Sequence, residues 1–582
     1  MNTDVERPLK FGSFELDLRS RELRKGTARV RLQDQPFEIL RLMLERPGHV
    51  VTRDELRHHL WPEGTFVDFE HSLNAAVKRL RAALGDDADN PSYVETLPRR
   101  GYRFIGPVDE TRAAEASAGG TPRVRMAVLP FTCLGDEQGQ EYFTDGLTEE
   151  MIAQLGRLCR GRIGVIARQS SMTFKATTRG AREIGQALRA GYLLEGSVRR
   201  EGDRVRITAR LVETAGETNL WVETYERHLT DYLSVQAEVA ARIARSLAME
   251  LAPEPPSSSL VVRSPDTAAY QAYLKARYAW NKPGDEAVEE ALAYFQQAIG
   301  ADPSYAPGYS GLARAHVSLA ERYHECPRLA LEKARDAAER ALQLDPALSE
   351  AHLALGEVRR MLQWDTRAAR SAYSQAIALN PSYETAHRAY ALMLTSLGRH
   401  AQAIREADRA RELDPLCLTV NTSAAWVRYA AGDYASAIEV CLHTIGIDDL
   451  YYPAARRLLG AAYLQLGREK DALQVLETAC EAGGVDPVAM AWLTHARAVL
   501  GHRAEAAGLL TKLERLARQR YVPPYHLAIA HAGLGDIDMA FDALARAAED
   551  RDPLILNVAV DPRFAPLRGD QRYLALVSRL GL

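Results

Sequence analysis

Polar, small and cationic residues gather between residues 68 and 104, where their spacing could support contact with a phosphate backbone. Five of them fall on one side of a single helix: Asn74, Ala75, Lys78, Arg79 and Arg81. Long cationic side chains on a helix reach phosphates or guanine edges in a major groove, and asparagine can pair with adenine through two hydrogen bonds. The small Ala75 would let such a helix approach closely. The alternative is that these charges only solvate an amphipathic helix.

The opposite side of this helix is apolar. Leu73, Val77, Leu80 and Leu84 are spaced at i, i+4, i+7 and i+11, which is the repeat of one buried helical face. Gly85 follows the last of them, and glycine commonly ends a helix at that position. The pattern therefore predicts a helix that packs one face on a core and leaves the other face free for contact.

A short hairpin follows the helix and carries three arginines. Residues 94–104 have the β-branched and aromatic composition of two strands, placed around a Pro-Arg-Arg-Gly turn. Arg99 and Arg100 at the exposed tip have no role in a core, and Arg103 lies nearby. These positions suit contact with a minor groove or with backbone phosphates.

The stretch from Leu9 to Val108 resembles the OmpR/PhoB-type effector domain, which is a winged helix. The similarity is carried by FGSFELDLRSRELRKGTARVRL, by LQDQPFEILRLMLERPGHVVTRDELRHHLWP and by the wing sequence TLPRRGYRF, all in the order of that family. The resemblance implies that the helix ending at Gly85 enters the major groove of double-stranded DNA. It also implies that the loop containing Glu63 and Asp68 contacts RNA polymerase.

Composition restricts where such a protein acts. The net charge is −4, so contact with nucleic acid has to come from a local patch. The six cysteines are scattered, and no run approaches the ~18 apolar residues of a membrane span. CadC/ToxR-like regulators place a transmembrane helix after a domain of this type, whereas residues 108–123 are polar and contain glycine. We therefore expect a cytoplasmic protein without membrane contact, metal or cofactor. Because no receiver domain is expected before the winged helix, we also expect no phosphorelay control.

Residues 124–251 alternate strand and helix signals, which predicts a compact α/β domain whose last helix covers about 232–251. The sequences AVLPF, FTDGLTEEM and YLLEGSVRREGDRVRITARL resemble the TolB-N-terminal-like domain. The segment has no phosphate-binding loop, nucleophile elbow or metalloprotease motif. Asp145, Glu149 and Glu150 could form an acidic site, but we interpret them as charges that favour the start of a helix.

Beyond residue 266 the chain is periodic. Glycines recur every 34 or 35 residues, each with an alanine five residues later: Gly398 with Ala403, Gly432 with Ala437, Gly467 with Ala472, Gly501 with Ala506, and Gly535 with Ala540. This period, with small residues where helices cross, resembles tetratricopeptide repeats, and the tail beyond residue 548 is expected to cap them. Such arrays offer a concave surface to a peptide or partner protein. His387, Tyr390, Tyr429 and Tyr463 could line that surface. The alternative, which we favour, is that Tyr390 and Tyr463 are packing residues.

These observations predict a multidomain α+β protein with an N-terminal winged helix, a central α/β domain and a C-terminal all-α tetratricopeptide solenoid. The expected boundaries are 1–108, 124–251 and 267–582, joined by linkers 109–123 and 252–266. We expect a sequence-specific, one-component DNA-binding transcriptional regulator that is not an enzyme, whose other two domains sense an effector or partner. One such module buries only ~600–1,000 Å² on DNA, so we expect a dimer or tandem binding. The alternatives are an interaction scaffold whose winged helix contacts protein, and an enzyme activity in the α/β domain.

Overall fold

The computed structural model divides the chain into two compact units, residues 1–123 and 124–582. The structure describes residues 9–11, 14–17, 21–25, 28–45, 50–60, 69–87, 91, 93–97, 101–106, 124–134, 141–158, 163–201, 204–228, 266–282, 284–322, 326–448, 453–481 and 486–582.

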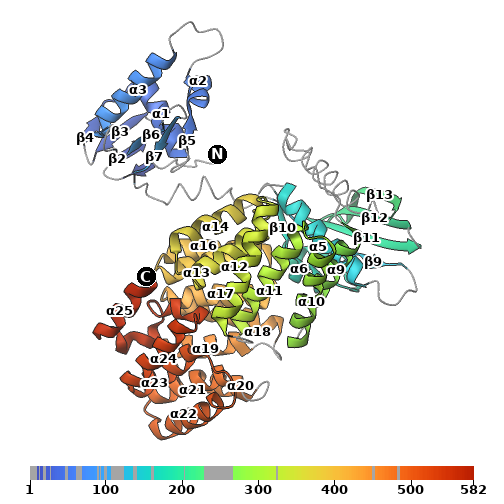
Figure 1. The fold of residues 1–582 in the computed structure, drawn as a ribbon, viewed down its shortest axis with the longest axis vertical. Helices are drawn as coiled ribbons and strands as arrows, with labels where there is room; N and C mark the ends of the chain where they lie inside the picture. The colour runs from blue at the N-terminus through green and yellow to red at the C-terminus, as the bar shows by residue number, and fades with distance from the viewer. Residues whose placement is uncertain are drawn as a thin grey trace. The chain divides into compact units, whose positions relative to one another are not determined.

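In its described residues, the first unit holds two small antiparallel sheets and three helices (Figure 1). The amino-terminal sheet is a meander of β1 (Leu9–Phe11), β2 (Phe14–Asp17), β3 (Glu22–Lys25) and β4 (Ala28–Val30). The helices are α1 (Asp34–Glu45), α2 (Arg53–Leu60) and α3 (Phe69–Leu84). The second sheet, in the order β5-β7-β6, consists of β5 (Val50–Thr52), β7 (Gly101–Phe104) and β6 (Val94–Leu97). Helix α3 and the hairpin β6–β7 are the elements that the sequence predicted to contact DNA.

The apolar face predicted for α3 is buried. Leu73, Val77, Leu80 and Leu84 are each at most 3% exposed, and they share one core with the amino-terminal sheet, α1 and the hairpin. Burial of such side chains contributes roughly 1.5–3 kcal/mol each, so the core alone holds α3 in place. Gly85 ends the helix in the left-handed conformation, with φ 67°. The outer face of α3 therefore takes no part in this apolar core.

Gly101 is required by close packing as well as by the turn. It pairs with Thr52 of β5, and a Cβ atom on Gly101 would lie 2.1 Å from the carbonyl oxygen of Val51. No side chain fits in that space, which is why the hairpin can lie directly against β5. Since α2 begins one residue after β5, this contact ties the hairpin to α2.

The second unit begins with an α/β domain. Its sheet runs in the order β10-β8-β11-β12-β13 with β9 beside β11; it is parallel among β10, β8 and β11 and antiparallel from β11 to β13. The strands are β8 (Val124–Val128), β9 (Thr132–Cys133), β10 (Ile163–Ile166), β11 (Tyr192–Glu201), β12 (Arg204–Glu213) and β13 (Thr218–His228). The helices are α5 (Glu141–Leu158), α6 (Arg168–Met172) and α7 (Ala181–Leu188). The helix expected at 232–251 and nearly all of both expected linkers lie outside the described residues.

Helices α9 to α24 pack in successive pairs and form the solenoid seen in Figure 1. They are α9 (Thr267–Trp280), α10 (Asp285–Ala301), α11 (Ala306–Arg322), α12 (Pro327–Leu344), α13 (Ser349–Met361), α14 (Thr366–Leu379), α15 (Glu384–Ser396), α16 (His400–Leu413), α17 (Leu418–Ala430), α18 (Tyr434–Ile447), α19 (Pro453–Gln465), α20 (Glu469–Glu481), α21 (Pro487–Val499), α22 (Arg503–Ala517), α23 (Pro524–Leu534) and α24 (Ile537–Glu549). The five periodic glycines stand just after the first helix of a pair, with φ between 68° and 88°. The five periodic alanines are fully buried. Glycine adopts that backbone conformation without strain, and small side chains let paired helices approach, so the period has its expected physical cause.

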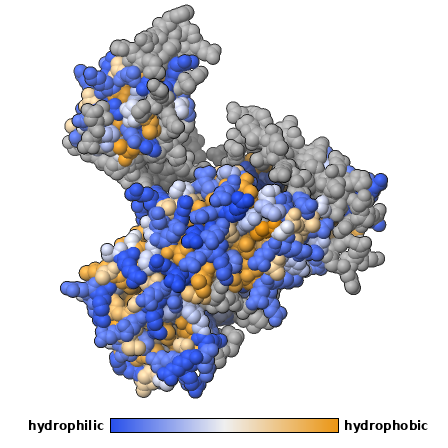
Figure 2. Space-filling model, in the orientation of Figure 1, coloured by the Kyte–Doolittle hydropathy of each residue, from blue (hydrophilic) through white to orange (hydrophobic). Residues whose placement is uncertain are grey.

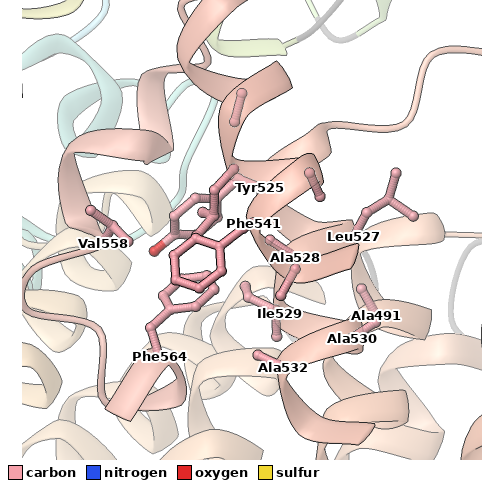
Figure 3. Packing of buried hydrophobic residues seen from close by; sticks show 14 of the residues in the cluster. Ala491, Tyr525, Leu527, Ala528, Ile529, Ala530, Ala532, Phe541, Val558 and Phe564 are labelled. Carbon is pink, nitrogen blue, oxygen red and sulfur yellow. The ribbon is translucent and has the colours of Figure 1, made fainter. Parts of the chain in front are cut away.

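The tail covers the end of the array with two 3-10 helices and a last α-helix. These are η2 (Pro553–Asn557), η3 (Pro562–Leu567) and α25 (Gln571–Leu580). The rings of Phe564 and Tyr525 are 5.3 Å apart between centroids, and both side chains are at most 1% exposed. Figure 3 shows these two rings together with Phe541 and Val558. The tail thus buries the apolar surface that a last repeat would otherwise expose.

The α/β domain and the first repeats share one hydrophobic core. Helix α5 packs on α9, and the common cluster contains Leu147 of α5 and Tyr273 of α9. Gly146 allows this close contact, since a Cβ atom there would lie 2.6 Å from the side chain of Leu274. The visible surface of the repeats is mixed, with hydrophobic residues interspersed among hydrophilic ones (Figure 2). The two segments predicted as separate domains are therefore one packed unit.

Candidate nucleic-acid interface

The outer face of α3 presents the residues that the sequence predicted for DNA contact. Asn74, Lys78 and Arg79 are exposed, whereas Ala75 and Arg81 are partly buried. The structure therefore brings all five to the same helix face, at different depths. Asn74, Lys78 and Arg79 are therefore the members of this face that solvent reaches.

The two exposed cations, Lys78 and Arg79, differ in whether they form hydrogen bonds within the domain. Lys78 has no ion pair or hydrogen bond within the part of the chain that the structure describes. Arg79 donates to the side-chain oxygen of Gln33 at 2.8 Å. That bond joins two exposed groups, so exchanging it for a phosphate would cost little.

Asn74 is held by the domain through its oxygen. Its Oδ1 accepts from the hydroxyl of Tyr102 at 2.8 Å and from the guanidinium of Arg53 at 3.3 Å. An amide oxygen has two lone pairs, so both are in use. The adenine pairing predicted for Asn74 needs that oxygen as an acceptor. In this geometry Asn74 instead offers its amide N–H groups, which suit a phosphate or a base acceptor.

The two remaining described arginines are bonded inside the domain. Arg81 donates from one terminal nitrogen to the carbonyl of Val94 at 2.7 Å and to the hydroxyl of Thr96 at 2.8 Å. Arg103 forms an ion pair with Glu95 at 2.6 Å. Of the other sequence-predicted positions, Glu63, Asp68, Arg99 and Arg100 lie outside the described residues.

Residues that sequence reasoning missed stand beside this face. Arg53, at the start of α2, stacks 5.3 Å from the ring centroid of Tyr102, and Asp86 accepts from the backbone N–H groups of Tyr93 and Val94. None of these contacts has a periodic signal, because each joins elements whose relative placement is set by the core. Only the packed domain shows that α2, α3 and the hairpin are bonded to one another.

The residues singled out on the repeats belong to helix packing. His387, Tyr429 and Tyr463 are 6%, 1% and 8% exposed. Tyr390 is partly buried, with its ring 6.2 Å from that of Tyr373. The packing interpretation of Tyr390 and Tyr463 agrees with these positions, and His387 and Tyr429, which the sequence placed on the partner surface, are buried as well.

Helix α5 is tied to the repeats by ion pairs. Glu149 pairs with Arg277 of α9 and lies 3.7 Å from Arg168, and Asp145 lies 3.8 Å from the same Arg168. Burial alone would raise the pKa of Glu149, but the guanidinium groups of Arg277 and Arg168 outweigh burial and hold it below its usual value. Because α5 begins at Glu141, these carboxylates lie in its middle turns. The interpretation of them as helix-start charges is therefore wrong.

The loop between α16 and α17 forms a second contact between the repeats and the α/β domain. The backbone N–H of Ala167 donates to the carbonyl of Leu413 at 2.7 Å. Asp414, which is 2% exposed, accepts from the backbone N–H of Ser170 at 2.9 Å and from its hydroxyl at 2.5 Å. The carboxylate of Asp414 is thus sealed within the contact between the domain and the repeats.

The sealed carboxylate predicts a pH dependence. Burial, aided by the nearby carboxylate of Glu384, raises the pKa of Asp414 to about 7. In an unfolded chain the pKa is ~3.9. An acid whose pKa is higher in the folded state favours folding most at low pH, and this contribution is lost as the pH rises from about 4 to about 7. We therefore expect the melting temperature of the second unit to fall between about pH 5 and pH 8.

Asp414→Asn should remove most of that decrease, because the amide oxygen still accepts from Ser170 and carries no charge. Calorimetry of both proteins at the two pH values measures the effect. An equal pH dependence in the wild type and the variant would assign the decrease to other groups.

Comparisons with known proteins match parts of this chain to transcriptional regulators. Residues 26–104 match the family described as transcriptional regulatory protein, C terminal. The chain is 22% identical over 424 residues to the transcriptional regulator HilA of Salmonella typhimurium, which covers 72% of this chain and 73% of HilA. It is 30% identical over 281 residues to a Rhizobium meliloti protein named "Putative adenylate cyclase 3", which covers 47% of this chain and only 43% of that protein. Among solved structures, the RstA DNA-binding domain of Klebsiella pneumoniae bound to the RstA box is 30% identical, with 17% of this chain and 98% of that chain covered and a TM-score of 0.16.

The fold and these matches define the class of the first unit: residues 26–104 are an OmpR/PhoB-type winged helix, which matches the DNA-binding domains of transcriptional regulators. Residues 123–242 match the second domain of HilA/YgeH-like transcriptional regulators, and a tetratricopeptide solenoid follows. Among the described residues, none of the helices has both the length and the apolar character needed to cross a membrane.

Proposed function

We propose that this protein is a cytoplasmic one-component regulator that reads double-stranded DNA in a sequence-specific way through α3 and the hairpin. The observation that carries the proposal is the division of α3 into two faces. Each of its apolar side chains is at most 3% exposed, whereas Asn74, Lys78 and Arg79 are exposed to solvent. A helix fully anchored on one side and cationic on the other is the shape that a major groove admits.

The contacts are proposed to divide between groove and backbone. Lys78 and Arg79 reach phosphates or guanine edges, and the small Ala75 permits close approach. The hairpin arginines Arg99, Arg100 and Arg103 add contacts in the minor groove or to its phosphates. Because the net charge of the chain is −4, the chain as a whole does not attract DNA. The attraction is therefore proposed to come from this cationic patch.

Further partners belong to the same proposal. The loop with Glu63 and Asp68 contacts RNA polymerase, and two copies bind together on DNA, as a dimer or in tandem, because one module buries too little surface for tight binding. The α/β domain and the solenoid sense an effector or bind a protein or peptide partner. The exposed parts of the first helix of each repeat are the surface proposed for that partner. Part of this surface is already covered, since Arg277 of α9 pairs with α5, α15 contacts η2 of the tail, and Trp492 of α21 lies against Arg563 of the tail. The regulator-domain matches favour a role without catalysis.

Lys78→Ala tests the proposal most directly. Loss of one phosphate contact is expected to weaken binding about tenfold, or ~1.4 kcal/mol, and to reduce the slope of log affinity against log salt by ~0.9. Affinity would be measured at several salt concentrations on DNA fragments recovered by genome-wide footprinting.

Lys25→Ala is the matched control. It removes the same charge from an exposed position in β3 of the same unit and should leave the salt slope unchanged. Wild-type affinity and slope for Lys78→Ala would exclude α3 as the DNA-contacting helix and would favour a scaffold role for the winged helix.

A further inference from the structure

The hairpin is bonded to α3 on both sides of one residue, Val94. The backbone N–H of Val94 donates to Asp86 Oδ2 at 2.8 Å, and its carbonyl accepts from Arg81 at 2.7 Å. Asp86 also accepts from the backbone N–H of Tyr93 at 3.1 Å, and Arg81 also donates to Thr96 at 2.8 Å. Charged groups at one end of the helix therefore hold Val94 and Thr96 of strand β6 and Tyr93 just before it. Hydrogen bonds to charged groups are among the stronger ones in proteins.

The end of α3 is shaped to make these bonds. Gly85 turns the chain through a left-handed φ of 67°, and the N–H of Asp86 then donates back to the carbonyl of Arg81 at 2.9 Å. This closure brings Asp86 and Arg81, five residues apart, to the same side of the helix end. At the other end of the helix, Asn74 accepts from Tyr102 of β7. The hairpin is thus tied to α3 at two separate places.

We propose that Arg81 and Asp86 are positioning residues that fix the wing against the recognition helix, so that both contact DNA as one rigid reading unit. This rests on the proposed function and changes one part of it. Arg81 acts through the hairpin, and the direct contacts of α3 fall to Lys78, Arg79 and the amide of Asn74. Pre-set geometry matters because ordering a loose wing on DNA would reduce the affinity gained from its contacts.

Asp86 provides the sharper test because charge and positioning predict opposite signs. Removing a carboxylate from a DNA-binding surface ordinarily strengthens binding, since the surface becomes more positive. If Asp86 positions the wing, Asp86→Ala instead weakens binding, by about fivefold to tenfold. Asp87→Ala is the matched control: it is exposed, one residue further on, and makes the same change of charge.

A double-mutant cycle separates positioning from general damage to the fold. Asp86→Ala and the wing variant Arg99→Ala/Arg100→Ala should be strongly non-additive, because both remove the wing contact. Asp86→Ala and Lys78→Ala should be additive, because Lys78 contacts DNA from the helix. Asp86→Asn, which keeps one acceptor oxygen, should recover part of the affinity and serves if Asp86→Ala fails to fold.

Amide hydrogen exchange tests, without DNA, whether Asp86 holds the hairpin against α3. Failure of this inference can therefore be told apart from failure of the proposed function. In Asp86→Ala the amides of Tyr93 and Val94 should exchange faster, while that of Leu80 in the core of α3 stays protected. Equal exchange in both proteins, or equal DNA affinity for Asp86→Ala and Asp87→Ala, would overturn the proposal. If the wild type bound no DNA, the proposed function would fail. Hydrogen exchange alone would then show whether Asp86 holds the hairpin against α3.

Discussion

Arg563→Ala is expected to lower the free energy of unfolding of the second unit by about 3–5 kcal/mol, because it leaves a buried carboxylate unpaired. Asp561 is fully buried and Arg563 is 4% exposed, and their side chains are joined by hydrogen bonds of 2.7 to 3.2 Å. Burial would raise the pKa of Asp561, but the Arg563 guanidinium outweighs burial and holds it below the usual value. The same guanidinium stacks 3.8 Å from the ring of Trp492. One substitution therefore removes an ion pair and a ring contact together.

Urea unfolding followed by circular dichroism would measure the loss. Arg572→Ala is the matched control, since Arg572 also pairs with an aspartate at 2.8 Å but is 49% exposed; exposed pairs contribute only ~0–1 kcal/mol. Arg563→Met combined with Asp561→Asn should be more stable than Arg563→Ala alone, because no buried charge is left. Similar decreases in the free energy of unfolding for Arg563→Ala and Arg572→Ala would show that the buried pair stabilises the fold no more than the exposed pair does.

Arg277→Ala is expected to cost about 3 kcal/mol, near the lower end for a broken buried pair. The side chains of Arg277 and Glu149 keep 26% and 17% exposure, so water screens the remaining charge in part. Arg277 also donates to the hydroxyl of Tyr273 at 2.7 Å. The loss should appear both in the α/β domain and in the first repeats, because α5 and α9 share one core.

A cycle of Arg277→Ala, Glu149→Ala and the double variant isolates the pair, and the double variant should be less destabilised than the sum of the single ones. Arg206→Ala is the control in the same domain, since its pair with Glu226 is more than half exposed and should contribute less than ~1 kcal/mol. Hydrogen exchange of α5 and α9 shows whether both soften together. Strict additivity, with exchange altered in α9 alone, would mean that Arg277 does not join the domain to the repeats.

Much of the fold could be predicted because its signals are local. The helical spacing of Leu73, Val77, Leu80 and Leu84 specifies one buried face, and Gly85 specifies the end of that helix. The period of 34 or 35 residues specifies paired helices, since glycine must take a left-handed angle after each first helix and alanine must fill each tight crossing. These requirements act within one helix or one repeat, so a linear sequence contains them in full.

The candidate DNA site could be predicted only in part. The helix and the hairpin form where the sequence predicted them, but the hydrogen bonds of each side chain could not be predicted from the sequence. Asn74 has its oxygen occupied by Tyr102, and Arg81 is bonded to Val94. The composition of α3 shows which groups are cationic, whereas the packing of α2, α3 and the hairpin decides which of them are already bound.

Local spacing along the chain specifies the classes of element, the apolar face of α3, the repeat period and the cationic patch, since each depends on residues that are close in sequence. The packing of the α/β domain onto the repeats appears only in the folded structure. The bond between Arg277 and Glu149 spans 128 residues, and that between Ser170 and Asp414 spans 244. Such pairs depend on how whole elements dock, which no local spacing specifies. The same reason applies to α3: its charges follow from the local sequence, whereas the fold sets which of them are bonded to the hairpin.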